Sequence, residues 1–216
     1  PFKPKRKTRA TIAIAKGLEP LAKIIMSQKN DDINLQASKF INEEKGVKSE
    51  EEAISGACDI IAEWINEHQF TRKRLRNLFE KEAIITSKII KGKETDGANY
   101  KNYFDCSERL MKAPSHRVLA MFRGETEGFL KITISPEEQK AIEIIESIFL
   151  KANNEASQFV KSAIRDSYKR LLLPSLDTEI RQVSKEKADK EAIKVFTENL
   201  KQLLMAPPLG QKSVLA

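Results

Sequence analysis

Residues 49–65, SEEEAISGACDIIAEWI, carry the clearest structural signal in the chain. Ser49 and Glu52 have the spacing of a capping box, in which a hydroxyl and a carboxylate bind two otherwise unpaired N–H groups at the start of a helix. Behind them, apolar side chains recur every three or four residues and form one stripe: Ile54, Ala57, Cys58, Ile61, Trp64 and Ile65. This spacing predicts an amphipathic helix that ends near His68 and buries the stripe in a core.

Further amphipathic helices are predicted before and after this one. Apolar residues at helical spacing predict short helices between residues 8 and 46. On the C-terminal side, Thr71 can cap a helix that would bury Leu75, Leu78 and Phe79 and expose its basic side chains.

A long helix is expected in the last third of the chain. It starts near Asn154 and reaches about Met205, and Pro174 either kinks it or opens a separate helix. Its segment 184–191 is polar except for Ala188, so this part is expected to cross open solvent or the surface of another domain. The alternative is a break near Ala188 that folds the helix back. Two apolar sets flank the segment: Leu176, Ile180 and Val183, which can pack on the chain's own core, and Ile193, Phe196, Leu200 and Leu203, which are expected to be partly exposed.

Two segments in the middle of the chain favour strands. Residues 84–90 are rich in β-branched side chains, and residues 129–134 alternate apolar with polar ones. Alternation with period two predicts a small two-stranded antiparallel ribbon. The fold class is therefore predicted as mainly α, about two-thirds helix, a multi-helix assembly with this ribbon and a long C-terminal helix.

Four regions are predicted along the chain. Residues 1–83 form an N-terminal helical region with a basic leader, and residues 84–135 form a small α+β insertion with the two-stranded ribbon. Residues 136–206 form a helical region with the long connector helix. Residues 207–216 contain Pro-Pro and are interpreted as a linker.

The composition limits the class of protein. The chain has 216 residues, of which 40% are apolar and 32% charged, and this apolar share is too high for a disordered chain. No stretch approaches the ~18 uncharged apolar residues of a membrane span, so no membrane partner is expected. The two cysteines, Cys58 and Cys106, show no disulfide pattern, which indicates an intracellular protein with reduced thiols. The chain starts without Met and ends on an apolar run, so it is interpreted as a fragment of a longer protein.

The residue spacing argues against a phosphate-binding loop and against a Cys/His metal site. A phosphate-binding loop around Gly92-Lys93 would need a glycine five positions earlier and a hydroxyl directly after the lysine, but Ser87 and Glu94 stand there. Cys58 and His68, like Cys106 and His116, lie ten residues apart, whereas metal ligands usually come in pairs two to five residues apart.

Ser115-His116-Arg117 does not form a nucleophile–base pair. Neighbouring residues on a helix point about 100° apart, so a capping or structural role for Ser115 is favoured over binding. We therefore expect no catalytic residues, no metal site and no cofactor, and the chain is predicted not to be an enzyme.

Basic clusters are the remaining candidates for a function. The net charge is +7, which favours an anionic partner where lysines and arginines gather. The candidate nucleic-acid-binding residues form a leader cluster and a helix cluster: Lys3, Lys5, Arg6, Lys7 and Arg9, and then Arg72, Lys73, Arg74 and Arg76. Both can equally be solvated surfaces, and the stacking aromatics of a single-strand platform are not evident.

Several segments, in order over nearly the whole chain, resemble the central region of the Tex family of bacterial transcription accessory proteins. They are residues 3–13 (KPKRKTRATIA), 17–22 (GLEPLA), 57–64 (ACDIIAEW), 87–94 (SKIIKGKE), 103–105 (YFD), 114–117 (PSHR), 169–175 (KRLLLPS) and 206–210 (APPLG). Cys106 stands where an aromatic residue is expected.

The resemblance implies a part of a cytoplasmic, multidomain nucleic-acid-binding factor that acts in transcription. It implies a helical region followed by an RNase H-like (YqgF-like) domain, helix-hairpin-helix elements and an RNA-binding barrel, all but the helical region lying outside this chain. The expected function is therefore a helical scaffold with auxiliary contact to the phosphate backbone of RNA or DNA. The alternative is a protein-docking module for the transcription machinery that does not bind nucleic acid itself.

Overall fold

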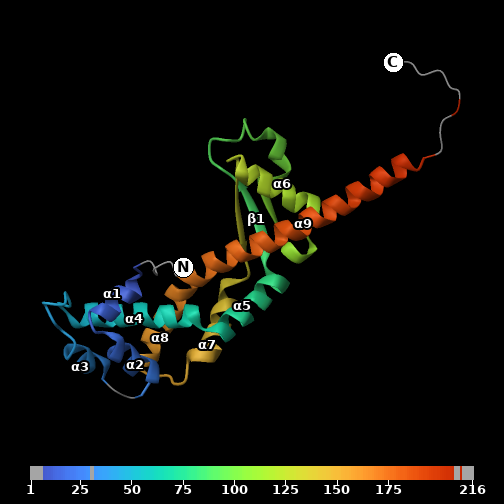
Figure 1. The fold of residues 1–216 in the computed structure, drawn as a ribbon. Helices are drawn as coiled ribbons and strands as arrows, with labels where there is room; N and C mark the ends of the chain where they lie inside the picture. The colour runs from blue at the N-terminus through green and yellow to red at the C-terminus, as the bar shows by residue number, and fades with distance from the viewer. Residues whose placement is uncertain (1–6, 30–31, 207–209, 211–216) are drawn as a thin grey trace, which may run out of the picture. The chain divides into compact units, whose positions relative to one another are not determined.

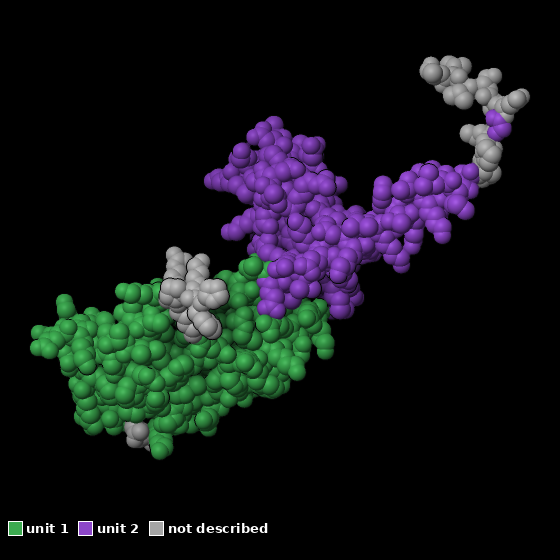
Figure 2. Space-filling model, in the orientation of Figure 1, with its two compact units in different colours: residues 1–83, 135–178 green, residues 84–134, 179–216 purple. Residues whose placement is uncertain are grey.

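The computed structural model describes residues 7–29, 32–206 and 210, and it divides into two compact units. The first unit contains residues 1–83 and 135–178, and the second contains residues 84–134 and 179–216 (Figure 2). The chain is 69% helical with a small three-stranded sheet and a long C-terminal helix, which confirms the predicted mainly α class.

The first unit is built around α4 (Glu50–Glu67), the helix predicted from residues 49–65 (Figure 1). It packs against five helices and a π-helical segment (Ser167–Leu172): α1 (Arg9–Ala15), α2 (Glu19–Ser27), α3 (Ile33–Ser38), α5 (Gln69–Glu82) and α8 (Glu155–Asp166). A further helix, α7 (Glu138–Phe149), packs against α5 and α8. In the predicted stripe, Ile61 and Ile65 are fully buried, whereas Cys58 and Trp64 are half-buried.

A buried glutamine joins the end of α2 to the turn between α7 and α8. Gln28 adopts a left-handed conformation with φ 54° and is 4% exposed. Its Nε2 donates to the carbonyl of Phe149 at 2.7 Å, and its Oε1 accepts from the backbone N–H groups of Lys151 at 2.8 Å and Ala152 at 3.2 Å. Asn154 closes the link, because its Nδ2 donates to the Gln28 carbonyl at 2.8 Å. The side chain thus supplies the partners that this turn cannot find within itself.

The long helix is continuous from Glu155 to Leu204. The π-helical segment connects α8 to α9 (Leu173–Leu204), so Pro174 neither breaks the helix nor starts a separate one. Proline lacks an N–H and its ring collides with the carbonyl four residues earlier, and a wider turn before it relieves both problems. The alternative, a break near Ala188, does not occur, because α9 continues through this position to Leu204. Val183 is 53% exposed, so its predicted place in the core is wrong.

The second unit contains the sheet, whose strand order is β2-β1-β3. The two predicted strands are confirmed as neighbours, β1 (Ile84–Ile89) and β3 (Leu130–Ser135), and the sheet has a third strand, β2 (Asp105–Arg109). Strand β2 pairs antiparallel with β1, with Ser87 opposite Cys106. The sequence DCSER lacks β-branched and large apolar residues, which is why it gives no strand signal. The helix α6 (Ser115–Thr126) and two short 3₁₀ helices, Ala98–Tyr103 and Leu110–Lys112, complete the connections.

Side chains cover the outer edge of β3. The N–H of Ile132 donates to Glu125 Oε1 at 3.2 Å, and Arg181 donates to the Ile132 carbonyl. Arg181 also pairs with Glu125 Oε2 at 2.6 Å, so the two charged groups hold each other in place. An exposed strand edge would otherwise offer these backbone groups to another chain.

Candidate nucleic-acid interface

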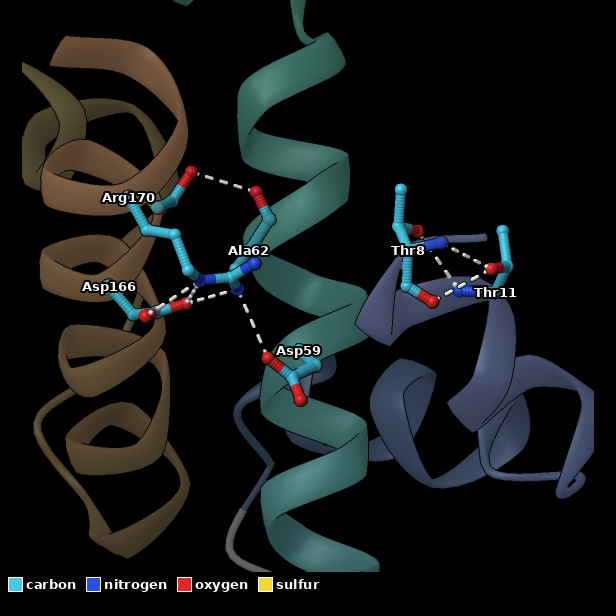
Figure 3. A network of polar contacts seen from close by, with 7 residues as sticks. Thr8, Thr11, Asp59, Ala62, Asp166 and Arg170 are labelled. Atoms are coloured by element: carbon cyan, nitrogen blue, oxygen red, sulfur yellow. Dashed lines mark hydrogen bonds and ion pairs between the residues drawn. The ribbon is translucent and has the colours of Figure 1, made fainter. Parts of the chain in front are cut away.

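The leader cluster is described only at its end. Lys3, Lys5 and Arg6 lie outside the described residues, whereas Lys7 and Arg9 are both exposed. The helix α1 begins directly after Lys7 with a capping box, in which the N–H of Thr11 donates to Thr8 Oγ1 at 3.2 Å and the N–H of Thr8 donates to Thr11 Oγ1 at 2.8 Å (Figure 3). This box fixes where the chain enters the first unit.

An open groove of about 310 Å³ runs between α1 and α4. Arg9 of α1 and Lys16 at its C-cap line one side of the groove, and Glu52 and Asp59 of α4 line the other. The groove therefore has charges of both signs, and Lys16 already donates from Nζ to the Gly46 carbonyl at 2.8 Å. This mixed lining does not favour a polyanion.

A network of charges joins α4 to the end of α8 (Figure 3). Arg170 Nη2 lies 3.1 Å from Asp59 Oδ1, and Arg170 Nε donates to Asp166 Oδ1 at 3.1 Å. Burial raises the pKa of Asp59, against the opposite effect of Arg170, and the hydrogen bond with Asp166 raises the pKa of Arg170. Burial also raises the pKa of Cys58 to about 12, with help from both aspartates, so this thiol stays protonated near neutral pH.

The helix cluster on α5 divides into inward and outward side chains. Arg72 is half-buried, donating from Nη2 to Ser175 Oγ at 2.7 Å and from Nη1 to Asn66 Oδ1 at 3.0 Å. Its guanidinium therefore fixes α5 to its neighbours. Lys73 and Arg74 are exposed, and Arg76 is half-buried and has contacts within the protein.

The start of α5 carries an aromatic group that the sequence analysis missed. Phe70 is 51% exposed, and the guanidinium carbon of Arg74 lies 5.7 Å from the centre of its ring. The N-cap is His68, not Thr71, because His68 Nδ1 accepts from the Thr71 N–H at 3.3 Å. Thr71 is instead fully buried in the first turn. The four-residue spacing of Phe70 and Arg74 was the available signal, since such pairs face each other on a helix.

The Ser115-His116-Arg117 segment has structural contacts in the second unit. Ser115 does not cap α6, because Pro114 occupies the N-cap and the Ser115 hydroxyl donates to Glu191. Arg117 donates from Nη2 to Cys106 Sγ at 3.3 Å and pairs through Nη1 with a carboxylate of β2 at 3.2 Å. The side chain of His116 is exposed.

Within residues 7–29, 32–206 and 210, no three His, Cys, Asp or Glu side chains gather as metal ligands. Over the same ranges, no helix is both apolar enough and long enough to cross a membrane.

Comparison with known proteins identifies the family. A family model described as Tex central region-like matches residues 28–196. The chain belongs to the Tex central region family. The chain is 43% identical over its whole length to YdcI of Bacillus subtilis and 34% identical to the transcriptional accessory protein Tex of Neisseria gonorrhoeae, covering 30% and 29% of those proteins. It is 25% identical, over 96% of its length, to S1 RNA-binding domain-containing protein 1 of Homo sapiens. The chain thus spans less than a third of the length of these relatives, and the resemblance drawn from its motifs is confirmed.

Proposed function

We propose that this Tex central region acts as the helical scaffold of a cytoplasmic, nucleic-acid-binding transcription accessory factor and adds contacts to the phosphate backbone of RNA or DNA. The relative from Neisseria gonorrhoeae is named a transcriptional accessory protein, and the human relative is named for an S1 RNA-binding domain. Both names support a nucleic-acid partner in transcription.

The observation that carries the proposal is the exposed basic face of α5. Lys73 and Arg74 extend into solvent from a helix that Arg72 holds through Asn66 and Ser175. Charged side chains on a fixed helix can bind phosphates without first ordering the backbone that carries them. The exposed Lys7 and Arg9 offer further phosphate contacts.

The proposal involves binding and no catalysis or cofactor. The polar groups that most resemble catalytic ones already have structural roles. The hydroxyl of Ser115 donates to Glu191, and the high pKa of Cys58 keeps its thiol from acting as a nucleophile near neutral pH.

The test is a salt titration of binding to a labelled single-stranded RNA and to duplex DNA. K73E/R74E removes two proposed phosphate contacts, and K39E/K45E is the matched control, because both pairs are exposed and both variants lower the net charge from +7 to +3. K73E/R74E should make the slope of log K against log salt shallower by about 1.4 for the single strand and 1.8 for the duplex. The control should leave it nearly unchanged. Equal effects of the two variants, or no binding at 50 mM salt, would contradict the proposal.

A specific observation favours protein docking as the second candidate function. In the distal part of α9, Ile193, Phe196 and Leu203 are 64%, 66% and 75% exposed, which confirms the exposure expected for this apolar set. Apolar side chains at this spacing form one stripe on a helix and mark a protein contact. The proposed partner is another part of the full-length protein or the transcription machinery. F196S/L203S should leave the stability of this chain unchanged and weaken that contact in the full-length protein, which limited proteolysis can detect.

A further inference from the structure

We propose that Phe70 stacks on an unpaired base of single-stranded RNA, while Lys73 and Arg74 bind the adjacent phosphates. This inference rests on the proposed function and specifies its ligand more closely. It adds a residue that contacts the base, where the proposed function involves only the phosphate backbone.

The packing of the first unit covers only about half of the Phe70 surface. Fully burying a phenylalanine side chain stabilises a protein by about 1.5–3 kcal/mol, and half of this surface remains in water. Phe70 and Phe196 are the two phenylalanines with highly exposed rings in the described part of the chain. Of these, Phe70 is the one with an arginine over its ring.

Neighbouring rings hold Phe70 in place. The His68 ring meets Phe70 edge-on, with centroids 6.4 Å apart, and meets Phe149 edge-on at 5.1 Å. His68 is itself fixed, because its Nδ1 lies 2.8 Å from Thr71 Oγ1 and Thr71 is fully buried. A ring that is already ordered loses little conformational entropy when a base stacks on it.

The charges around Phe70 suit a nucleic acid. Phe70, Lys73 and Arg74 lie at positions i, i+3 and i+4, so they share one face of α5. All three are exposed, and Lys81 follows two turns further along the helix, beside the acidic Glu80. An aromatic ring flanked by cations is how proteins bind single strands, with the base on the ring and the phosphates on the cations.

The same features select the type of nucleic acid. Stacking on a side chain requires a base that is free of a duplex, so a single strand is expected to bind better than a double strand. The single-stranded nucleic acid that transcription releases is the transcript. The proposed ligand is therefore RNA.

The experiment measures binding of the whole chain to a 12-nucleotide RNA with 2-aminopurine at its centre. F70L keeps an apolar side chain and removes the ring, F70W keeps a ring, and F196L is the control at the other exposed phenylalanine. F70L should weaken binding about 5- to 150-fold and abolish the fluorescence quenching that stacking causes. F70W should restore both, and F196L should change neither. Because no charge is lost, F70L should leave the salt slope unchanged.

Each other outcome has a separate meaning. If RNA binds with the slope change expected for K73E/R74E but F70L has no effect, stacking is refuted while the proposed function stands. If F70L weakens a duplex RNA as much as the single strand, or if F70W does not rescue, Phe70 acts as a structural or protein-docking residue and the inference fails. If single-stranded DNA of the same sequence binds equally well, the assignment to RNA is wrong. Absence of any RNA binding would refute both proposals.

Discussion

Replacing Gln28 by alanine should destabilise the first unit by about 2–4 kcal/mol. The side chain makes three hydrogen bonds to the backbone of the turn between α7 and α8. Each contributes about 0.5–1.5 kcal/mol net, and no larger penalty is expected because Lys151 and Ala152 are exposed, so water can reach their N–H groups. The backbone strain at φ 54° is nearly the same for both residues, so the lost hydrogen bonds should decide the result. This is a large part of the 5–15 kcal/mol that holds a typical domain together.

The chain contains a built-in reporter for this measurement. Trp64 is its single tryptophan and lies on α4, so its fluorescence follows the unfolding of the first unit in urea. Gln139→Ala is the matched control. Gln139 is an exposed glutamine in the same unit, and its Nε2 donates a hydrogen bond to Glu143 Oε1 at 3.1 Å on the same helix. It should change the free energy of unfolding by less than about 0.5 kcal/mol.

A double-mutant cycle tests whether Gln28 and Asn154 act as one network. Asn154→Ala removes the N-cap of α8 and the bond to the Gln28 carbonyl. Residues in one hydrogen-bond network show interaction energies of about 0.5–3 kcal/mol, so the double variant should lose less than the sum of the single variants. The reasoning is refuted if Gln28→Ala costs less than about 0.5 kcal/mol with an unchanged urea dependence, since the turn would then not need this side chain.

Three further predictions concern the rest of the fold. Between pH 9 and 12 the unfolded chain loses the Cys58 proton while the folded chain keeps it, so the free energy of unfolding should fall by up to about 1.4 kcal/mol per pH unit as pH rises. Tyr168, whose pKa is also raised in the folded chain, should add to this fall above pH 10. Urea midpoints measured from pH 7 to 10.5 test this, and Cys58→Ala should flatten the pH profile. Ile180→Ala should cost about 2–4 kcal/mol in urea unfolding, because the residue is 4% exposed, whereas Leu203→Ala at 75% exposure should cost less than about 0.5 kcal/mol. Arg181→Met should cost about 2–3 kcal/mol and increase hydrogen exchange in β3, whose outer edge loses a donor; unchanged exchange there would contradict the role assigned to this arginine.

The sequence predicted those elements whose signal lies in their own residues. The apolar stripe of α4 and the alternation in residues 129–134 each identify an element without reference to the rest of the chain. The strand β2 forms because its backbone pairs with β1, whereas its own five residues have no preference for the strand conformation. Tertiary pairing of this kind cannot be found in a local pattern.

The position of the candidate site on α5 was predicted, but which of its cations are free to bind a ligand was not, because that also depends on tertiary contacts. The run of basic residues in the sequence located the cluster on α5, but sequence alone treated its four cations as equivalent. The structure separates them, because Arg72 faces inward to Asn66 and Ser175 while Lys73 and Arg74 face solvent. Whether a cation is available to a ligand depends on contacts over a hundred residues away in the chain, which spacing does not reveal.

The π-helical segment before Pro174 coincides with a four-residue period of apolar side chains. Buried apolar residues from Ile164 to Leu176 recur in steps of four: Ile164, Tyr168, Leu172 and Leu176. On an α-helix with 3.6 residues per turn, each such step overshoots a full turn by about 40°, so three steps would turn the stripe about 120° away from the core. A wider turn within this interval cancels the drift and also removes the clash that Pro174 would cause. Two independent features, the four-residue period and the proline, thus require the same local widening. That widening keeps Ser167 bonded to the Ala62 carbonyl and Arg170 beside Asp59, both on α4, while the helix continues past the proline to Leu204.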